Sequence, residues 1–159
     1  KAEFFEPFGP RPFGVKLVAT LAVLVGVFRL SRRQVQYFAR TFFGVELALG
    51  TISKLEQEAS DALAPVYTEA LDAARASEAA FVDETSWQMK HRTHWLWVMV
   101  TGVASVFMIH ARRNTLAAKA LLGGFAGNLV TDRCASYLFV SNRRRQLCWA
   151  HSRASSDRS

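Results

Sequence analysis

The sequence predicts an α/β fold in which an N-terminal helical segment precedes a mixed β-sheet. Three observations support this prediction. Apolar residues in the first half recur at spacings of three and four, as on one face of a helix. From residue 80 onward, short runs rich in Val, Phe and Trp are typical of strands. A helical pattern separates the third run from the fourth, and such a crossover lets a strand return parallel to its sheet.

The first half is expected to be helical throughout. An apolar helix over residues 15–29 comes first, and Ser31 then caps a helix that runs to about Phe42. Gly44 provides a turn into the next helix, and Pro65 suits the first turn of a further one. The pair around Gly44 has the outline of a helix-turn-helix. It either reads DNA or packs as an ordinary helical hairpin.

The second half is expected to form three antiparallel strands, a helix, a parallel strand and a fifth strand. Asn114 caps the helix, which covers residues 116–122. The predicted strands cover residues 80–83, 95–101, 106–110, 128–132 and 146–150. We therefore divide the chain into a helical segment (1–77), a sheet domain (78–151) and a disordered tail (152–159).

The charge distribution favours a polyanionic partner. Residues 1–80 hold nine Lys or Arg and nine Asp or Glu, whereas residues 81–159 hold eleven against four, which accounts for the net charge of +7. Double-stranded DNA is the first candidate, and solubility alone is the alternative. The candidate DNA-binding residues are Arg32, Arg33, Lys54, Arg112, Arg113, Arg143, Arg144 and Arg145.

Two further features bound the functional class. The chain has only two cysteines, which cannot form a disulfide framework, so a reducing compartment is expected. The apolar stretches 17–28 and 95–109 are shorter than the roughly 20 residues that a membrane-spanning helix needs, so no membrane span is expected.

Two aspartates are the candidate catalytic and metal-binding residues. Asp83 and Asp132 each follow a short apolar run, and we expect each to end its strand. If these strands are neighbours, the carboxylates converge at one sheet edge, where Mg²⁺ or Mn²⁺ would balance their repulsion. The alternative is that each aspartate only caps the following turn. On a strand, Glu84 would face the opposite side of the sheet from Asp83.

Five segments in order resemble the insertion sequence 66 family of DDE transposases. They are Phe81 to Trp87 with its Asp-Glu-Thr motif, Trp95 to Val98, the arginine at 112 or 113, Leu122 to Asp132, and Cys148-Trp149-Ala150-His151. The resemblance covers roughly residues 30–151. It implies a truncated ribonuclease-H-like catalytic domain in which Asp83 and Asp132 are the first two acids of the DDE triad.

The resemblance also implies cofactors and partners. Two Mg²⁺ or Mn²⁺ ions would serve DNA strand cleavage and transfer, and Cys148 and His151 would support the site. The DNA partners would be transposon ends and target. The protein would be bacterial, cytoplasmic and nucleoid-associated, with a possible homo-oligomer.

The chain also departs from the family pattern. Arg133 and Cys134 stand where the family often has Gly and Tyr, and the third acid, a Glu, has no counterpart. The sequence therefore predicts a transposase fragment that is inactive alone. The alternative is a DNA-binding remnant or regulator without catalysis.

Overall fold

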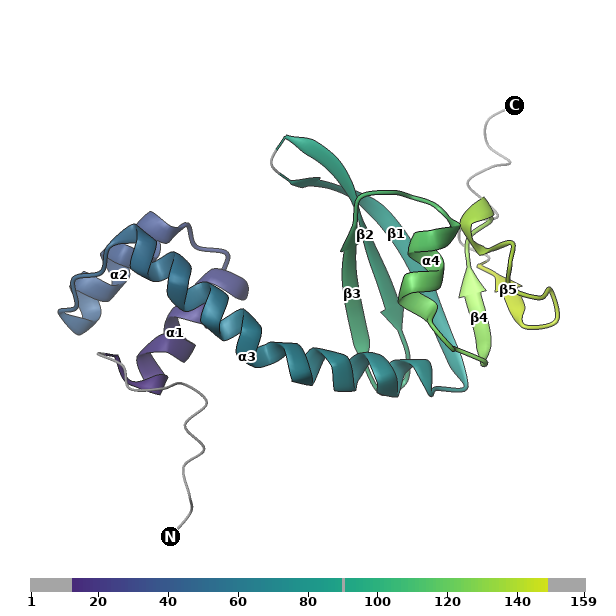
Figure 1. Cartoon of the computed structure of the whole chain (residues 1–159), viewed down its shortest axis with the longest axis horizontal. Coiled ribbons are helices and arrows are strands. Elements are labelled where there is room, and N and C mark those ends of the chain that lie inside the picture. Colours follow the sequence, from purple (N-terminus) through teal and green to yellow (C-terminus); the bar gives the residue numbers. More distant parts are fainter. Residues whose placement is uncertain (1–12, 90, 149–159) are drawn as a thin grey trace, which may run out of the picture. The chain divides into compact units, whose positions relative to one another are not determined.

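The computed structural model describes residues 13–89 and 91–148 and confirms an α/β fold, with helices followed by a five-stranded mixed sheet (Figure 1). The chain divides into two compact units, Lys1–Pro65 and Val66–Ser159. The boundary lies within a helix, and each unit is described by itself. Within the described ranges, no helix is both long and apolar enough to cross a bilayer.

The first unit packs three helices, α1 (Val15–Gly26), α2 (Arg32–Phe43) and the beginning of α3 (Leu49–Arg75). Ser31 caps α2 as predicted, in a capping box with Gln34. Gly44 follows α2 with a φ of 64°, a left-handed conformation that glycine adopts without steric cost. The buried core of this unit consists of Val18, Leu21, Val35, Ala39, Leu47, Ile52 and Leu55.

The prediction that Pro65 begins a new helix is wrong, because α3 is continuous from Leu49 to Arg75 and contains Pro65 in its interior. Proline removes one helical hydrogen bond, the one that the carbonyl of Asp61 would accept. Residues 60–69 are all exposed, so water can bind this carbonyl and the cost of the missing bond is reduced.

The second unit is a sheet with strand order β3-β2-β1-β4-β5. Strands β1 and β2 are antiparallel, as are β2 and β3, whereas β4 runs parallel to both β1 and β5. Helix α4 provides the crossover between β3 and β4. The bounds are β1 (Ala79–Met89), β2 (Arg92–Val100), β3 (Ser105–His110), α4 (Thr115–Leu122), β4 (Asn128–Thr131), a 3-10 turn (Ala135–Tyr137) and β5 (Arg145–Leu147).

One face of the sheet forms the core of this unit. In Figure 1, α4 lies against this face. The C-terminal part of α3 also packs there through Ala70, Leu71 and Ala74. Arg75, at the end of α3, donates hydrogen bonds to the carbonyl oxygens of Leu121 (3.1 Å) and Ala120 (2.7 Å) in α4. The opposite face keeps large apolar side chains in solvent: Phe81 is 59% exposed and Phe107 55%.

Strand β1 is longer than predicted, which corrects the expectation that Asp83 ends its strand. The ladder with β2 continues to the pair Met89↔Arg92, whereas β4 pairs with β1 only as far as Phe81. The β1–β2 hairpin therefore extends beyond its neighbours, as Figure 1 shows. Beyond Glu84 no residue of β1 is buried, so the apolar alternation that marks a strand is absent there. The last strand, β5, begins one residue earlier than predicted, and residues 149 and 150 lie outside the described ranges.

Gly127 allows the loop before β4 to approach the start of β1. The backbone N–H of Asn128 donates to the carbonyl of Glu78 at 2.7 Å, and a Cβ on Gly127 would lie 2.4 Å from the same oxygen. We expect Gly127→Ala to lower the free energy of unfolding by about 1–3 kcal/mol, because the backbone must shift to relieve the overlap. Chemical denaturation measures this change.

Gly124→Ala is the matched control, because a Cβ there meets nothing within 4 Å. Equal stability of the two variants would contradict the close approach of Gly127 to β1.

Candidate active site

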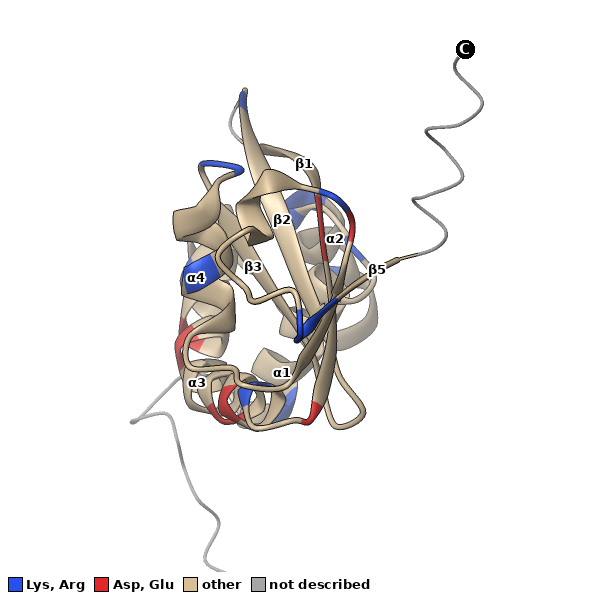
Figure 2. Cartoon of the chain, turned by 90° about the vertical axis from the view of Figure 1, so that its right-hand side faces the viewer, with Lys and Arg blue, Asp and Glu red and all other residues tan. Residues whose placement is uncertain are grey.

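Asp83 lies on β1, and Asp132 directly follows β4, the strand that pairs in parallel with β1. The β1–β4 ladder pairs Ala79 with Asn128 and ends with Phe81 beside Val130. Continuing this register by two residues places Asp83 beside Asp132. Figure 2 shows the acidic residues of β1 in red within the strand.

The two aspartates line the same hollow. It has a volume of about 180 Å³, and its walls include Val98, Val100 and Cys148. The structure thus brings together three of the four residues predicted to form or support the site. The fourth, His151, lies outside the described residues.

The carboxylate of Asp83 accepts a hydrogen bond from the backbone N–H of Glu84 at 2.9 Å. The carbonyl of Glu78 faces β4, so by the alternation along a strand the N–H of Glu84 faces the same side. At that level the ladder with β4 has already ended. The N–H of Glu84 therefore has no partner on β4 and donates to the side chain of Asp83 instead. This bond holds the Asp83 carboxylate at the exposed face.

Glu84 points to the opposite face, which confirms the prediction made from strand alternation. Its side chain is 0% exposed. One carboxylate oxygen, Oε1, accepts a hydrogen bond from Nε of Arg113 at 2.8 Å, and Oε2 accepts one from the hydroxyl of Tyr137. Both oxygens of this buried carboxylate are therefore bound.

Arg113 connects Glu84 to Asp132. Its guanidinium carbon lies 5.0 Å from the centre of the Trp95 ring, and its Nη2 atom lies 3.7 Å from Oδ2 of Asp132. The hydrogen bond to Glu84 raises the pKa of Arg113 above its usual value, so Arg113 stays charged.

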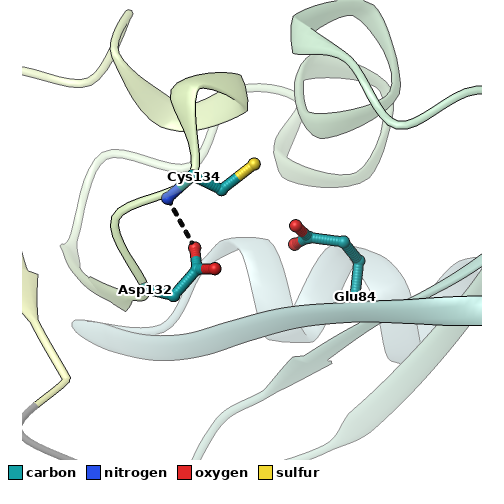
Figure 3. A group of neighbouring side chains, drawn as sticks. All are labelled: Glu84, Asp132 and Cys134. Atoms are coloured by element: carbon teal, nitrogen blue, oxygen red, sulfur yellow. Dashed lines mark hydrogen bonds between the residues drawn. The ribbon is translucent and has the colours of Figure 1, made fainter. Parts of the chain in front are cut away.

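Asp132 begins the loop that follows β4, and its Oδ1 accepts a hydrogen bond from the backbone N–H of Cys134 at 2.8 Å. Figure 3 shows the carboxylates of Asp132 and Glu84 pointing toward each other, with the thiol of Cys134 on the same side. One ligand atom from each of these three residues lies within 4.8 Å of the others.

This group of three is a poor cation site despite its spacing. Both oxygens of Glu84 already accept hydrogen bonds, and Arg113 supplies a positive charge between the acids. A thiol is also a soft ligand that Mg²⁺ does not favour. Asp83 and Asp132, which both line the hollow, carry oxygen ligands of the kind that Mg²⁺ and Mn²⁺ prefer.

Sequence reasoning did not assign Tyr137 or Cys134 to the site. Tyr137 is fully buried, and its ring meets that of Trp97 edge-on at 6.1 Å. Nothing in the local pattern shows that its hydroxyl reaches Glu84, 53 positions away. The alternation of side chains along β1 was the one sequence signal that placed Glu84 and Asp83 on opposite faces of the sheet.

The predicted DNA-binding arginines fall at two ends of the sheet. Arg112 and Arg113 follow β3, and Arg113 lies beside Asp132. The run Arg143 to Arg145 instead leads into β5, where Arg145 pairs with Leu129 near the start of β4. The side chain of Arg144 donates to the carbonyl of Ala126 at 2.7 Å and so stabilises the loop before β4.

In the helical unit, Arg32 forms a two-pronged ion pair with Glu56, with N–O distances of 2.8–3.1 Å. Arg33 and Lys54, the other two predicted residues there, are exposed.

Comparison with known proteins gives one family. The family model described as "Transposase IS66 family" matches residues 11–156, which is nearly the whole chain. No curated protein matches the chain significantly.

Burial of Tyr137 leads to a prediction about pH. Burial, and then the adjacent Glu84 carboxylate, raises the pKa of the Tyr137 hydroxyl far above its ordinary value of 10.0. Above pH 10 the unfolded state loses this proton and the folded state keeps it. Stability should therefore fall with rising pH, by about 1.4 kcal/mol per pH unit.

Urea unfolding of the wild type and Tyr137→Phe between pH 9 and pH 11 tests this expectation. The variant lacks the hydroxyl, so its stability should fall less steeply across this range. Identical slopes would show that the hydroxyl is not buried against Glu84.

Proposed function

The chain belongs to the IS66 family of transposases, and on this basis we propose that it carries part of the metal-dependent site for DNA strand cleavage and strand transfer. Asp83 and Asp132 are its metal-binding acids. The observation that supports this assignment most directly is that both line one hollow just beyond the last residue pair of the parallel β1–β4 ladder.

The donors fit a hard divalent cation. Both candidate ligands are carboxylates, which Mg²⁺ and Mn²⁺ prefer, and both residues line the hollow. Held by these carboxylates, such ions would supply Lewis acidity for phosphoryl transfer. Cys148 lies at the same hollow and is proposed as a supporting residue, together with His151.

The chain's own residues orient these acids. The backbone N–H of Cys134 holds Oδ1 of Asp132, and the backbone N–H of Glu84 holds one oxygen of Asp83. Each carboxylate is therefore directed before any substrate arrives, which reduces the reorganisation that binding requires.

We assign the second unit to a ribonuclease-H-like domain. The support is its topology, an antiparallel β3-β2-β1 meander with β4 and β5 added parallel on the β1 side after a helical crossover. The DDE triad requires a third acid, and this chain contributes two. We therefore propose that the two acids of these 159 residues do not suffice for cleavage by themselves.

DNA binding without catalysis is the second candidate. The exposed cations of the helical unit and the loops around the sheet favour it, because a polyanion can bind them without displacing structural contacts. The DNA would be transposon ends or target, in association with the nucleoid, and the active assembly is a homo-oligomer in this proposal.

We expect Asp83→Asn and Asp132→Asn each to reduce Mg²⁺-dependent cleavage of transposon-end DNA by at least about 100-fold in the full-length transposase. Each should also weaken Mn²⁺ binding to this chain, measured by electron paramagnetic resonance. Asp72→Asn, on the exposed surface of α3, is the control and should leave both unchanged. Full cleavage by both variants would rule out the assignment.

The helical unit gives a separate prediction. Arg33→Ala and Lys54→Ala should each weaken DNA binding. Each should also reduce the slope of log affinity against log salt concentration by about 1, the contribution of one phosphate contact. Arg32→Ala should mainly lower stability, because Arg32 is paired with Glu56. Fluorescence anisotropy across a salt series and thermal unfolding distinguish the two effects. If Arg33→Ala and Lys54→Ala both leave the salt dependence of DNA binding unchanged, these residues of α2 and α3 do not contact DNA.

A further inference from the structure

We propose that Glu84 is a positioning residue that holds the Arg113 guanidinium beside Asp132, where Arg113 binds a phosphate oxygen of DNA. This inference rests on the proposed function, because it needs DNA at the Asp132 edge of the sheet. It assigns Glu84 a role different from that of the adjacent Asp83.

The first step concerns the anchor. A carboxylate with a fully buried side chain must be paired, since an unpaired charge in a protein core is strongly destabilising. Glu84 meets this requirement through Arg113 and Tyr137, which each bind a different oxygen. Because the hydroxyl of Tyr137 is itself buried, the carboxylate cannot rotate without losing both partners.

The second step concerns what the anchor leaves free. Glu84 binds Nε, and the ring of Trp95 lies 5.0 Å from the guanidinium carbon. Within residues 13–89 and 91–148, Nη1 and Nη2 make no hydrogen bond. Oδ2 of Asp132 lies 3.7 Å from Nη2, which is beyond hydrogen-bonding distance. The side chain of Arg113 is 40% exposed, so these donors can be reached from solvent.

The third step concerns the ligand. A guanidinium with two free terminal nitrogens matches the oxygens of a phosphate. Its position beside a metal-binding acid would put this phosphate at the proposed reaction site, where arginine and metal ions together stabilise charge on phosphoryl oxygens. Glu84 and Trp95 also restrict the side chain of Arg113 before DNA binds. Arg113 therefore loses less conformational entropy on binding.

The sign of one substitution tests the proposal. Glu84→Gln removes a negative charge close to the DNA, and general electrostatics would therefore strengthen binding. Loss of the anchor predicts the opposite, a decrease in affinity of about tenfold, the size of one charge-assisted hydrogen bond. The measurement is fluorescence anisotropy of a labelled transposon-end duplex with the 159-residue chain, in EDTA.

Four further variants complete the DNA experiment. Arg113→Ala should lose at least as much DNA affinity as Glu84→Gln. The double variant should bind DNA no more weakly than Arg113→Ala alone, because the two residues act through one contact. Arg113→Lys keeps the charge but loses the planar donors, so it should also bind about tenfold more weakly. Glu78→Gln, at the exposed residue just before β1, is the matched control and should not weaken binding.

A metal measurement separates this role from ligation. If Glu84 positions Arg113, Glu84→Gln keeps its Mn²⁺ affinity within about threefold, whereas Asp132→Asn loses it. Equal Mn²⁺ loss in both variants makes Glu84 a ligand and overturns the inference.

The remaining outcomes are also decisive. Unchanged or tighter DNA binding by folded Glu84→Gln overturns the inference and leaves the proposed function standing. If circular dichroism shows this variant unfolded, Arg113→Lys decides, and wild-type affinity there overturns the inference. Failure of the wild type to bind DNA at low salt defeats the proposed function itself.

Discussion

Burial of the Glu84 carboxylate is the constraint on which the sheet unit depends. A buried acid requires hydrogen-bond donors, and the structure takes them from two distant segments: Arg113 after β3 and Tyr137 after β4. These bonds tie the loops at one edge of the sheet to its central strand. The bond to Glu84 also places the Arg113 guanidinium beside Asp132. A positive charge at the candidate site therefore results from the burial of Glu84.

Two adjacent acids in β1 serve opposite faces because side chains alternate along a strand. Asp83 lies at the exposed face, where it lines the hollow, while Glu84 lies within the core. Asp132 begins a loop, so one of its oxygens can approach Arg113 while the residue also lines the hollow with Asp83. Asp132 is therefore the residue shared by the proposed metal site and the surroundings of Arg113.

Three of the arginines predicted to bind DNA are held by other groups of the chain. Arg32 is paired with Glu56, Arg144 holds the carbonyl of Ala126, and Arg113 is anchored by Glu84. Their first role is to stabilise local structure, and only groups with donors left over can also meet a phosphate. Net charge alone therefore overstates the number of residues available to DNA.

Local sequence was sufficient for the order of the strands and their crossover helix, the Ser31 cap, the Gly44 turn and the alternation that places Asp83 and Glu84 on opposite faces. Each of these depends mainly on neighbours within a few residues. It also predicted that Asp83 and Asp132 follow apolar runs that could pair. It could not predict that α3 continues through Pro65, because that depends on the exposure of Asp61 and its surroundings. Nor could it give the length of β1, which its pairing with β2 determines. Only the tertiary structure decided that Glu84 binds Arg113 and Tyr137, because contacts between residues 29 and 53 positions apart arise from the crossing of chain segments.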